Sequence, residues 1–300
     1  MRTRTTVAAV SGALALSALV MPAAQAGTDG SAGVGRPSVA EQHGVAVPGA
    51  VSGASRSASV GAQAAPTVSN VRINAGKSVV VGSQSAKTFT VSLTASHPSG
   101  IKSLYIDLWH GADPDAADGW LPPAEGVTCA VVSSTTAADC KMTITARPGL
   151  NDPNGKGDLY ANILAGTWHV GVGVWANDDS EYVNDFYKTH RVQRNAVLTM
   201  NASPEPVRKG STLSLKGAFT RANWETGTYS KFTNQYLQLQ FKKAGSTAYS
   251  KVKTAKSNSY GAISTSNTAV YDGTWRFYFS GASTTTSPLT VSPGDYVDVR

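Results

Sequence analysis

The sequence IKSLYIDLW at residues 101–109 alternates apolar with other side chains, and TWHVGVGVW at residues 167–175 does the same. Successive side chains of a β-strand point to opposite faces, so a period of two residues is typical of a strand with one face on a core. In the first stretch Leu104, Ile106 and Leu108 share a face, and in the second three valines do. Both stretches are therefore predicted to be strands of a sheet that packs on an apolar core.

Similar short stretches, separated by turn residues, continue on both sides. Seven such strands over residues 66–194 are typical of an immunoglobulin-like sandwich. Residues 195–300 contain further short strand candidates of the same kind. The predicted fold class is all-β, with one immunoglobulin-like β-sandwich domain in each of these ranges. The other predicted strands are 68–73, 88–94, 127–132, 141–145, 186–192, 197–200, 212–219, 236–242, 250–253, 261–265, 274–279 and 296–299.

The N-terminus has the parts of an export signal. Two arginines precede an apolar stretch over residues 7–20, and small residues surround Ala26. Residues 1–26 are therefore predicted to be a signal peptide. The mature protein is expected to be secreted and extracellular, without a membrane span, because this stretch is shorter than the ~20 residues that a span needs. Residues 27–65, rich in Ala, Gly and Ser, are predicted to be a flexible linker or pro-segment.

The two predicted domains differ in net charge. Residues 66–194 hold ten basic and twelve acidic residues, a net charge of −2, whereas residues 195–300 hold twelve and five, a net charge of +7. Lys242, Lys251 and Lys253 are expected to project from the outward face of one hairpin of the basic domain. In an exported protein such a face would meet anionic wall polymers or acidic glycans before nucleic acid. The alternative is that these lysines give solubility and protect a sheet edge.

The sequence contains two cysteines, Cys129 and Cys140. An even number of cysteines in an exported protein predicts one disulfide bond, and the short separation predicts that it joins adjacent strands. A redox site would need a Cys-x-x-Cys motif, which the sequence lacks.

The chain resembles a group of actinobacterial secreted proteins with tandem immunoglobulin-like domains, whose function is not established and which are sometimes labelled calcium-binding. The resemblance covers most of residues 66–300, and it implies the fold, the compartment and a possible calcium ion as cofactor. It rests on SGIKS at 99–103, TC at 128–129, DC at 139–140, GTW at 166–168, NWE at 223–225, DGTWR at 272–276 and GDYVDV at 294–299.

Two acidic loops are candidates for calcium. Asp113, Asp115 and Asp118 follow one predicted strand, and Asp178 and Asp179 follow another. Carboxylate oxygens are the ligands that calcium prefers, although the spacing is not that of an EF-hand loop. The alternative is that these residues are ordinary turn residues.

The sequence of the first domain also predicts an aromatic patch. If the strands at 101–109 and 167–175 are neighbours, Tyr105, Trp109 and Trp175 lie together on the face away from the core, above Gly171 and Gly173. Exposed aromatic rings stack on sugars and anchor protein interfaces. The alternative is that the second domain or a loop covers them.

Signals of an enzyme are weak. None of the five histidines belongs to a pair with metal-ligand spacing, and the sequence contains no G-x-S-x-G, phosphate loop or dinucleotide motif. The function predicted is a secreted, non-catalytic binding or scaffolding protein at the cell surface or in the extracellular matrix, with a cell-wall polymer, glycan or protein as partner. The alternatives are a calcium-binding extracellular module and, third, a secreted hydrolase or inhibitor.

Overall fold

The two stretches that predict the fold form β5 (Ile101–His110) and β9 (Gly166–Ala176), which pair antiparallel inside a six-stranded sheet. The computed structural model describes residues 36–41, 45–46, 64–124, 128–133, 136–149, 158–281, 284–287 and 289–300. The other strands of this sheet are β1 (Val45–Ala46), β3 (Val79–Val81), β6 (Gly119–Leu121) and β10 (Glu181–Arg194).

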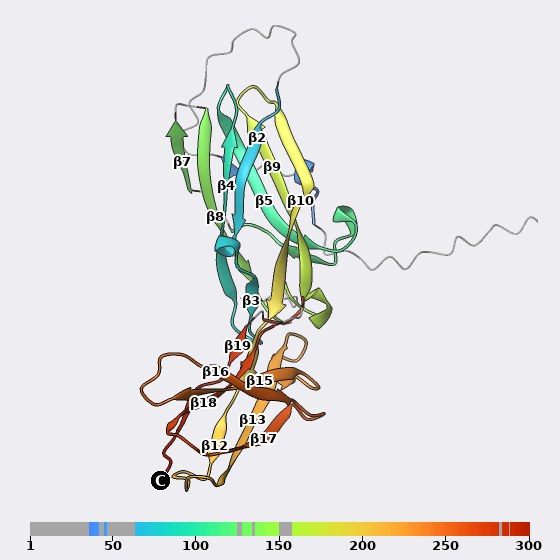
Figure 1. The fold of residues 1–300 in the computed structure, drawn as a ribbon. Coiled ribbons are helices and arrows are strands. Elements are labelled where there is room, and N and C mark those ends of the chain that lie inside the picture. Colours follow the sequence, from blue (N-terminus) through green and yellow to red (C-terminus); the bar gives the residue numbers. More distant parts are fainter. Residues whose placement is uncertain are drawn as a thin grey trace, which may run out of the picture. The chain divides into compact units, whose positions relative to one another are not determined.

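A second sheet, of four strands, forms the other layer of the first sandwich (Figure 1). Its order is β2-β4-β8-β7, and Ile106, Trp168 and Ile144 are among the fully buried side chains of the core between the layers. The alternation of β5 and β9 thus places one face of each strand on this core, as predicted. The bounds are β2 (Thr67–Ile73), β4 (Lys87–Ser96), β7 (Thr128–Ser133) and β8 (Ala137–Ala146).

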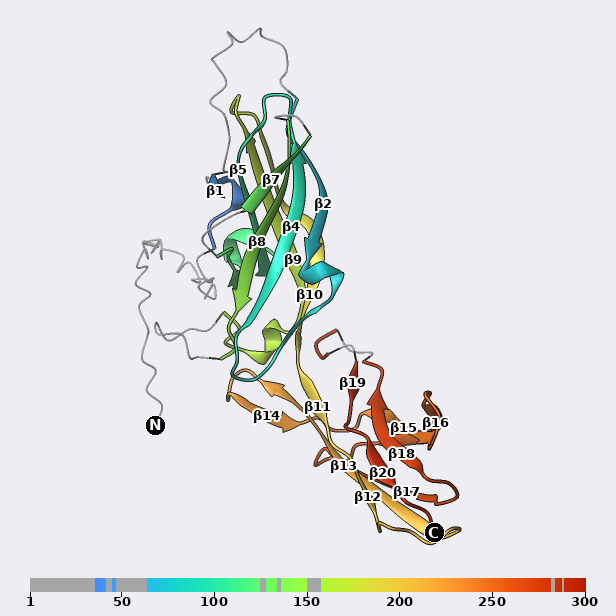
Figure 2. The ribbon, with the colours of Figure 1, turned by 90° about the vertical axis from the view of Figure 1, so that its left-hand side faces the viewer.

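The strands of the second sandwich begin at Ala196, after β10 ends at Arg194. Phe219, Leu239 and Phe277 are fully buried in its core. One sheet is built around β13 (Thr212–Asn223), with β11 (Ala196–Leu198), β12 (Asn201–Ser203), β14 (Thr228–Lys231) and β17 (Ala262–Thr268). The other, shown with β13 and β17 in Figure 2, contains β15 (Tyr236–Lys243), β16 (Ser250–Lys256), β18 (Gly273–Phe279), β19 (Thr290–Val291) and β20 (Asp295–Val297).

The described part of the chain is therefore all-β, with two immunoglobulin-like β-sandwiches, and the predicted fold class is confirmed for it. The short strands β1, β3, β6, β12, β14 and β19 were not predicted, because two to four residues are too few to show an alternation. Single turns of 3₁₀-helix are η1 (Val39–Glu41), η2 (Asn74–Gly76), η3 (Pro114–Ala116) and η4 (Asn162–Leu164). Among the residues that the structure describes, no helix is long and apolar enough to span a membrane.

The predicted disulfide bond is confirmed. Cys129 of β7 lies directly opposite Cys140 of β8, and their sulfur atoms are bonded. The bond therefore joins adjacent antiparallel strands of one sheet, and it does not connect the two sheets of the sandwich.

Part of the predicted linker lies on the first sandwich. Residues 36–41 and 45–46, called here the N-terminal segment, include β1, which pairs with β5 (Figure 2). Val39 and the side chain of Arg36 are fully buried. The composition did not predict this contact, because the two large side chains are diluted among small residues. The predicted signal peptide and most other residues of the predicted linker lie outside the described residues.

Candidate functional site

The outward face of β5 carries a carboxylate that is fully removed from solvent. Asp107 is 0% exposed, and its Oδ2 accepts hydrogen bonds from Tyr105 Oη at 3.0 Å and from Trp120 Nε1 at 2.9 Å. Arg36 Nε, from the N-terminal segment, donates to the same oxygen at 2.8 Å. A buried carboxylate is costly unless a positive partner and hydrogen bonds compensate it, and Asp107 has both.

Arg36 contacts two carboxylates from different strands. Its Nη2 donates to Asp107 Oδ1 at 3.1 Å and to Asp185 Oδ1, on β10, at 2.7 Å. Since Nε binds the other oxygen of Asp107, the guanidinium makes the bidentate contact that lysine cannot make. The guanidinium carbon of Arg36 also lies 5.3 Å from the ring centre of Trp109. The residues that receive the guanidinium are called here the arginine pocket: Tyr105, Asp107, Trp120 and Asp185.

The pKa shifts of the residues in the arginine pocket fit a partner side chain that always carries a positive charge. Burial raises the pKa of Asp107, and the hydrogen bond and positive charge of Arg36 act against that rise. Burial and the charge of Asp107 raise the pKa of Tyr105, so its hydroxyl remains a donor. Burial lowers the pKa of Arg36, but the hydrogen bonds and charges of its two carboxylate partners outweigh burial and raise it. The pocket therefore suits a guanidinium, which keeps its charge when buried.

Two glycines of β9 let the N-terminal segment lie directly on the sheet. In the register of β5 and β9, Gly171 is opposite Asp107. A Cβ at Gly171 would lie 2.6 Å from Arg36 Nη2, and a Cβ at Gly173 would lie 2.6 Å from a methyl carbon of Val39. Both distances are far shorter than van der Waals contact, so the close approach of the segment requires glycine at both positions.

The predicted aromatic patch lies on this face, but it is not an open surface. Tyr105 is 4% and Trp109 0% exposed, because the N-terminal segment and neighbouring side chains cover them. The ring of Trp109 stacks on His169 at 4.4 Å and meets the edge of Phe186 at 5.0 Å. Trp175 is half-buried. The structure thus corrects the expectation of an open patch for Tyr105 and Trp109. They are covered, as the alternative had it, but the N-terminal segment takes part in the cover in place of the second domain or a loop.

The two acidic loops predicted to bind calcium lie at opposite ends of one sheet. Asp113, Asp115 and Asp118 follow β5, whereas Asp178 and Asp179 follow β9, and these strands run antiparallel. The five carboxylates therefore do not form a single site. Among the described residues, no group of three or more His, Cys, Asp and Glu side chains is arranged to hold a metal ion.

In the first loop two carboxylates have local partners. Asp113 Oδ1 accepts a hydrogen bond from the backbone N–H of Asp115 at 3.0 Å, at the start of η3. Asp118 Oδ1 lies 2.6 Å from His110 Nδ1. This is the arrangement of a capped turn, the alternative that the sequence left open.

The two carboxylates of the second loop also have partners within the fold, one local and one from β5. Asp178 Oδ1 accepts a hydrogen bond from Ser180 Oγ at 2.6 Å, and Asp179 Oδ1 accepts one from Lys102 Nζ at 2.8 Å. Calcium binding stays a prediction for either loop. Titration calorimetry with millimolar calcium on the parent protein and on Asp115→Asn and Asp179→Asn variants would assign it to one of them.

One group of side chains has the composition of a catalytic triad without its geometry. His97 Nε2 lies 3.3 Å from Ser180 Oγ, and His97 Nδ1 lies 3.7 Å from Asp178 Oδ2. However, Nε2 is also 2.7 Å from the carbonyl oxygen of Ala64, which can only accept a hydrogen bond. Nε2 is therefore occupied as the donor and cannot take a proton from the serine, as a general base must.

In the second sandwich a β-bulge separates the three predicted lysines. Lys251 lies opposite Gln240 and Lys253 opposite Leu239, with a register shift between the two pairs. Residues directly opposite share a face, so Lys251 lies on the outward face with Lys242, whereas Lys253 lies on the core side, with Leu239. Lys253 Nζ donates to a backbone oxygen of β17 in the other sheet. The prediction that all three lysines project outward is thus corrected for Lys253.

Basic side chains on the outward face of β15 and β18 lie over a tyrosine ring. The guanidinium carbon of Arg276 is 3.6 Å from the ring centre of Tyr249, and Lys242 Nζ is 5.2 Å from the same centre. Arg276 Nε also donates to Gln240 Oε1 at 2.9 Å. The contact with the ring of Tyr249 therefore restrains both cations, and a hydrogen bond also holds Arg276.

The same pairing recurs at the other end of β15. Lys256 Nζ lies 5.1 Å from the ring centre of Tyr236, whose side chain is 68% exposed. Tyr278 continues the row on β18, 5.9 Å from the guanidinium carbon of Arg276. These residues are called here the cationic face: Tyr236, Gln240, Lys242, Tyr249, Lys251, Lys256, Arg276 and Tyr278.

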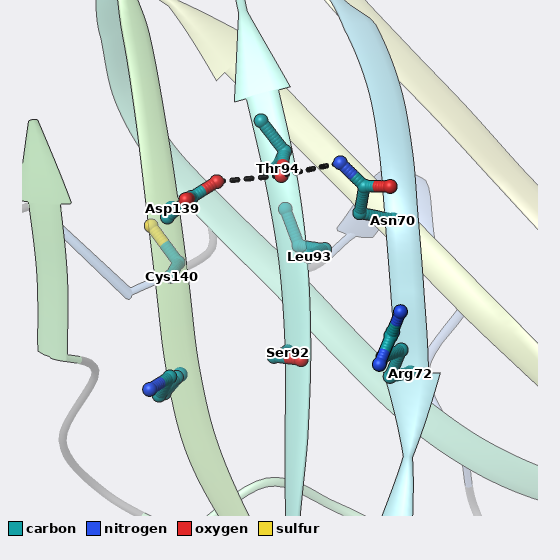
Figure 3. A pocket seen from close by; sticks show the side chains of 8 residues that line it. Asn70, Arg72, Ser92, Leu93, Thr94, Asp139 and Cys140 are labelled. Carbon is teal, nitrogen blue, oxygen red and sulfur yellow. Dashed lines mark hydrogen bonds between the residues drawn. The ribbon is translucent and has the colours of Figure 1, made fainter. Parts of the chain in front are cut away.

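An open hollow of about 360 Å³ lies on the sheet of β2, β4 and β8 in the first sandwich. Thr94 Oγ1 donates to Asp139 Oδ1 at 2.5 Å and accepts from Asn70 Nδ2 at 3.2 Å, so side chains of three strands are linked across it (Figure 3). Arg72 and Lys141 also line the hollow. Its central polar groups bind one another, which is the usual role of cross-strand pairs on an outward sheet face.

Sequence reasoning missed the residues that complete both sites. Trp120 and Asp185 stand in predicted turns or at strand edges, and Tyr249 precedes a strand, so no periodicity marks them. Arg36 could have been noticed, because a basic side chain beside Pro37 is unusual within a stretch of small residues. Its partner could not be deduced, since the pairing spans 71 positions.

No family model and no curated protein matches the chain. Among solved structures, it is similar to fibronectin(III)-like modules of Clostridium thermocellum CbhA at 10% identity and a TM-score of 0.31, over 76% of this chain and 92% of that one. Three N-terminal domains of the bacteriophage RB49 outer capsid protein Hoc match at 11% identity and a TM-score of 0.28, over 78% and 70%. The Escherichia coli adhesin FdeC matches at 13% identity and a TM-score of 0.27, over 77% and 63%. Similarity at this level does not bear on function.

Proposed function

We propose that the chain is a secreted, non-catalytic binding or scaffolding protein that attaches to an anionic polymer at the cell surface or in the extracellular matrix. The cationic face of the second sandwich is the binding surface. The observation that carries this proposal is the stacking of Arg276 and Lys242 on Tyr249.

Stacked cations are suited to bind anions from outside. Among the described residues no carboxylate lies within ion-pair distance of Arg276, Lys242 or Lys256, so their charges are not neutralised within the fold. Because the rings already restrict these side chains, less conformational entropy is lost when an anion binds them. Tyr236, more than half exposed, adds a ring on which a sugar could stack.

The charge of the whole domain supports the same partner. Residues 195–300 carry a net charge of +7, against −2 for residues 66–194. A domain with a net positive charge attracts polyanions over a distance of about 10 Å at moderate salt, and this attraction weakens as salt is added. Sulfated or phosphorylated polysaccharides are therefore favoured over neutral ones.

The experiment compares immobilised dextran sulfate with neutral dextran as probes for the full chain without its signal peptide. We expect binding to dextran sulfate only. The affinity should fall as the salt concentration rises from about 50 to about 300 mM, because salt screens the attraction between the charges. A variant with Lys242→Gln, Lys256→Gln and Arg276→Gln should bind at least about tenfold more weakly.

The matched control removes three exposed cations from elsewhere in the same sandwich: Arg208→Gln, Lys209→Gln and Lys216→Gln. Both variants lose the same formal charge. Equal weakening in both would mean that net charge alone governs binding, and it would contradict a site on the cationic face.

A further inference from the structure

The N-terminal segment lies on the first sandwich as a bound peptide would. Val45 pairs with Leu104 and Ala46 with Ser103, which adds an antiparallel strand to the edge of the sheet. Upstream of that strand Arg36 enters the arginine pocket and Val39 lies against the glycines of β9. Strand addition to a sheet edge is a common mode of peptide recognition, in which pockets for side chains give the specificity.

We propose that the outward face of β5, β9 and β10 is a recognition site for an arginine in an extended peptide. The chain's own N-terminal segment occupies this site, and a peptide of the same chemistry from outside can replace it. The site lies in the first sandwich, so it is independent of the cationic face and of the function proposed there.

The receptor half of the site is built without the segment. Tyr105 and Trp120 donate to Asp107 from β5 and β6, and Asp185 comes from β10. These strands belong to one sheet, so the carboxylates keep their places whichever chain supplies the guanidinium.

The specificity follows from burial. Asp107 and the side chain of Arg36 are both 0% exposed, so a neutral side chain in this place would leave a buried carboxylate without a counter-charge. Lysine would supply the charge but not the fork that meets Nε–Oδ2 at 2.8 Å and Nη2–Oδ1 at 3.1 Å. Arg36 Nη1 is buried without a hydrogen-bond partner in the described structure, so a ligand that offers one more acceptor could bind better than the chain's own segment.

The covalent connection makes the chain's own segment hard to displace. Residues 47–63 join β1 to the described chain before β2, and such a tether gives the segment an effective concentration on the order of millimolar. Cutting the tether removes this advantage without removing any residue of the site. An outside peptide can then compete at its own affinity.

The test uses the full chain with a site-specific protease sequence inserted between Ala50 and Val51. After cleavage, the N-terminal fragment should remain bound through gel filtration. A fluorescent synthetic peptide of residues 34–48 should then exchange with it, as fluorescence anisotropy would show. The uncut protein should bind this peptide far more weakly, because its own segment competes.

Peptide variants test the recognition itself. The Arg36→Gln peptide should bind at least about thirtyfold more weakly, and the Arg36→Lys peptide at least about tenfold, whereas the Ala40→Ser peptide, changed at an exposed position, should stay within about threefold. In the cut protein Asp185→Asn should also weaken binding of the parent peptide, and circular dichroism would verify that this variant is folded. Equal affinity of the Gln and Arg peptides would overturn the proposal. So would a cut fragment that never exchanges, because the segment would then be a permanent strand of the fold.

Discussion

Arg36 Nε donates to Asp107 Oδ2 at 2.8 Å across 71 positions of sequence, and neither side chain is exposed to solvent. A charged pair so deeply buried contributes little net stability when intact, but removing one partner is costly. The pair therefore fixes where the N-terminal segment lies on the sheet. The cost of breaking it can be measured.

Arg36→Met should lower the free energy of unfolding by about 3 kcal/mol, because Asp107 is left buried without a counter-charge. The double variant Arg36→Met, Asp107→Asn should recover part of the loss, since the remaining group is neutral. Urea denaturation of the two single variants and the double variant gives the coupling energy. Additive effects would show that the two residues do not act as a pair.

Gly173→Ala should loosen the N-terminal segment. The new Cβ would lie 2.6 Å from Val39 and 2.5 Å from the ring of Trp175, so both contacts must open. We expect a loss of about 1–3 kcal/mol in stability and faster cleavage after Glu41, an exposed residue of the N-terminal segment, by a glutamate-specific protease. Gly82→Ala is the control, because a Cβ there would meet only Tyr229 Oη, at an ordinary 3.5 Å. Equal cleavage rates in the two variants would contradict this role for Gly173.

The long strands could be predicted from the sequence, because an alternation of five or more residues with one buried face leaves few other structures. β5 and β9 are the best case: both predicted strands are present, and they pair, which from the sequence alone was only a condition. β12 and β14 show the limit, since Asn201–Ser203 and Thr228–Lys231 are polar and short, and only their pairing with β13 makes them strands.

The sites were less predictable, for two physical reasons. The outward face of β5 was identified, but its cover comes from Arg36 and Val39, in a stretch whose composition is that of a flexible linker. In the second sandwich a bulge after Lys251 turns Lys253 to the core side, and a bulge leaves no clear signal in an alternating pattern. Long-range contacts and register shifts both depend on tertiary structure.

Reducing the bond between Cys129 and Cys140 should lower the melting temperature of the protein. The bond closes a short loop between β7 and β8, and a loop of about ten residues corresponds to roughly 2–3 kcal/mol in the chain-entropy model. Calorimetry with and without dithiothreitol measures the change, with Cys129→Ala, Cys140→Ala as the genetic equivalent. Two reactive thiols in the native protein, or identical melting curves, would contradict this prediction.

The acid stability of the first sandwich should depend on Asp178. The hydrogen bond from Ser180 Oγ lowers the pKa of this carboxyl below its ordinary value of 3.8, and burial acts in the opposite direction but is weaker. Because the folded carboxyl holds its proton less tightly than the unfolded one, its contribution to stability is present above pH 3.8 and lost as the pH falls through the folded pKa.

Ser180→Ala should raise the pKa of Asp178 and make stability between pH 4 and 2 less dependent on pH. Carbon-13 NMR titration follows the carboxyl directly, and Ser69→Ala, an exposed serine on β2, should leave its titration unchanged. A pKa of Asp178 that is the same in the parent and in Ser180→Ala would show that this hydrogen bond does not hold the carboxylate in solution.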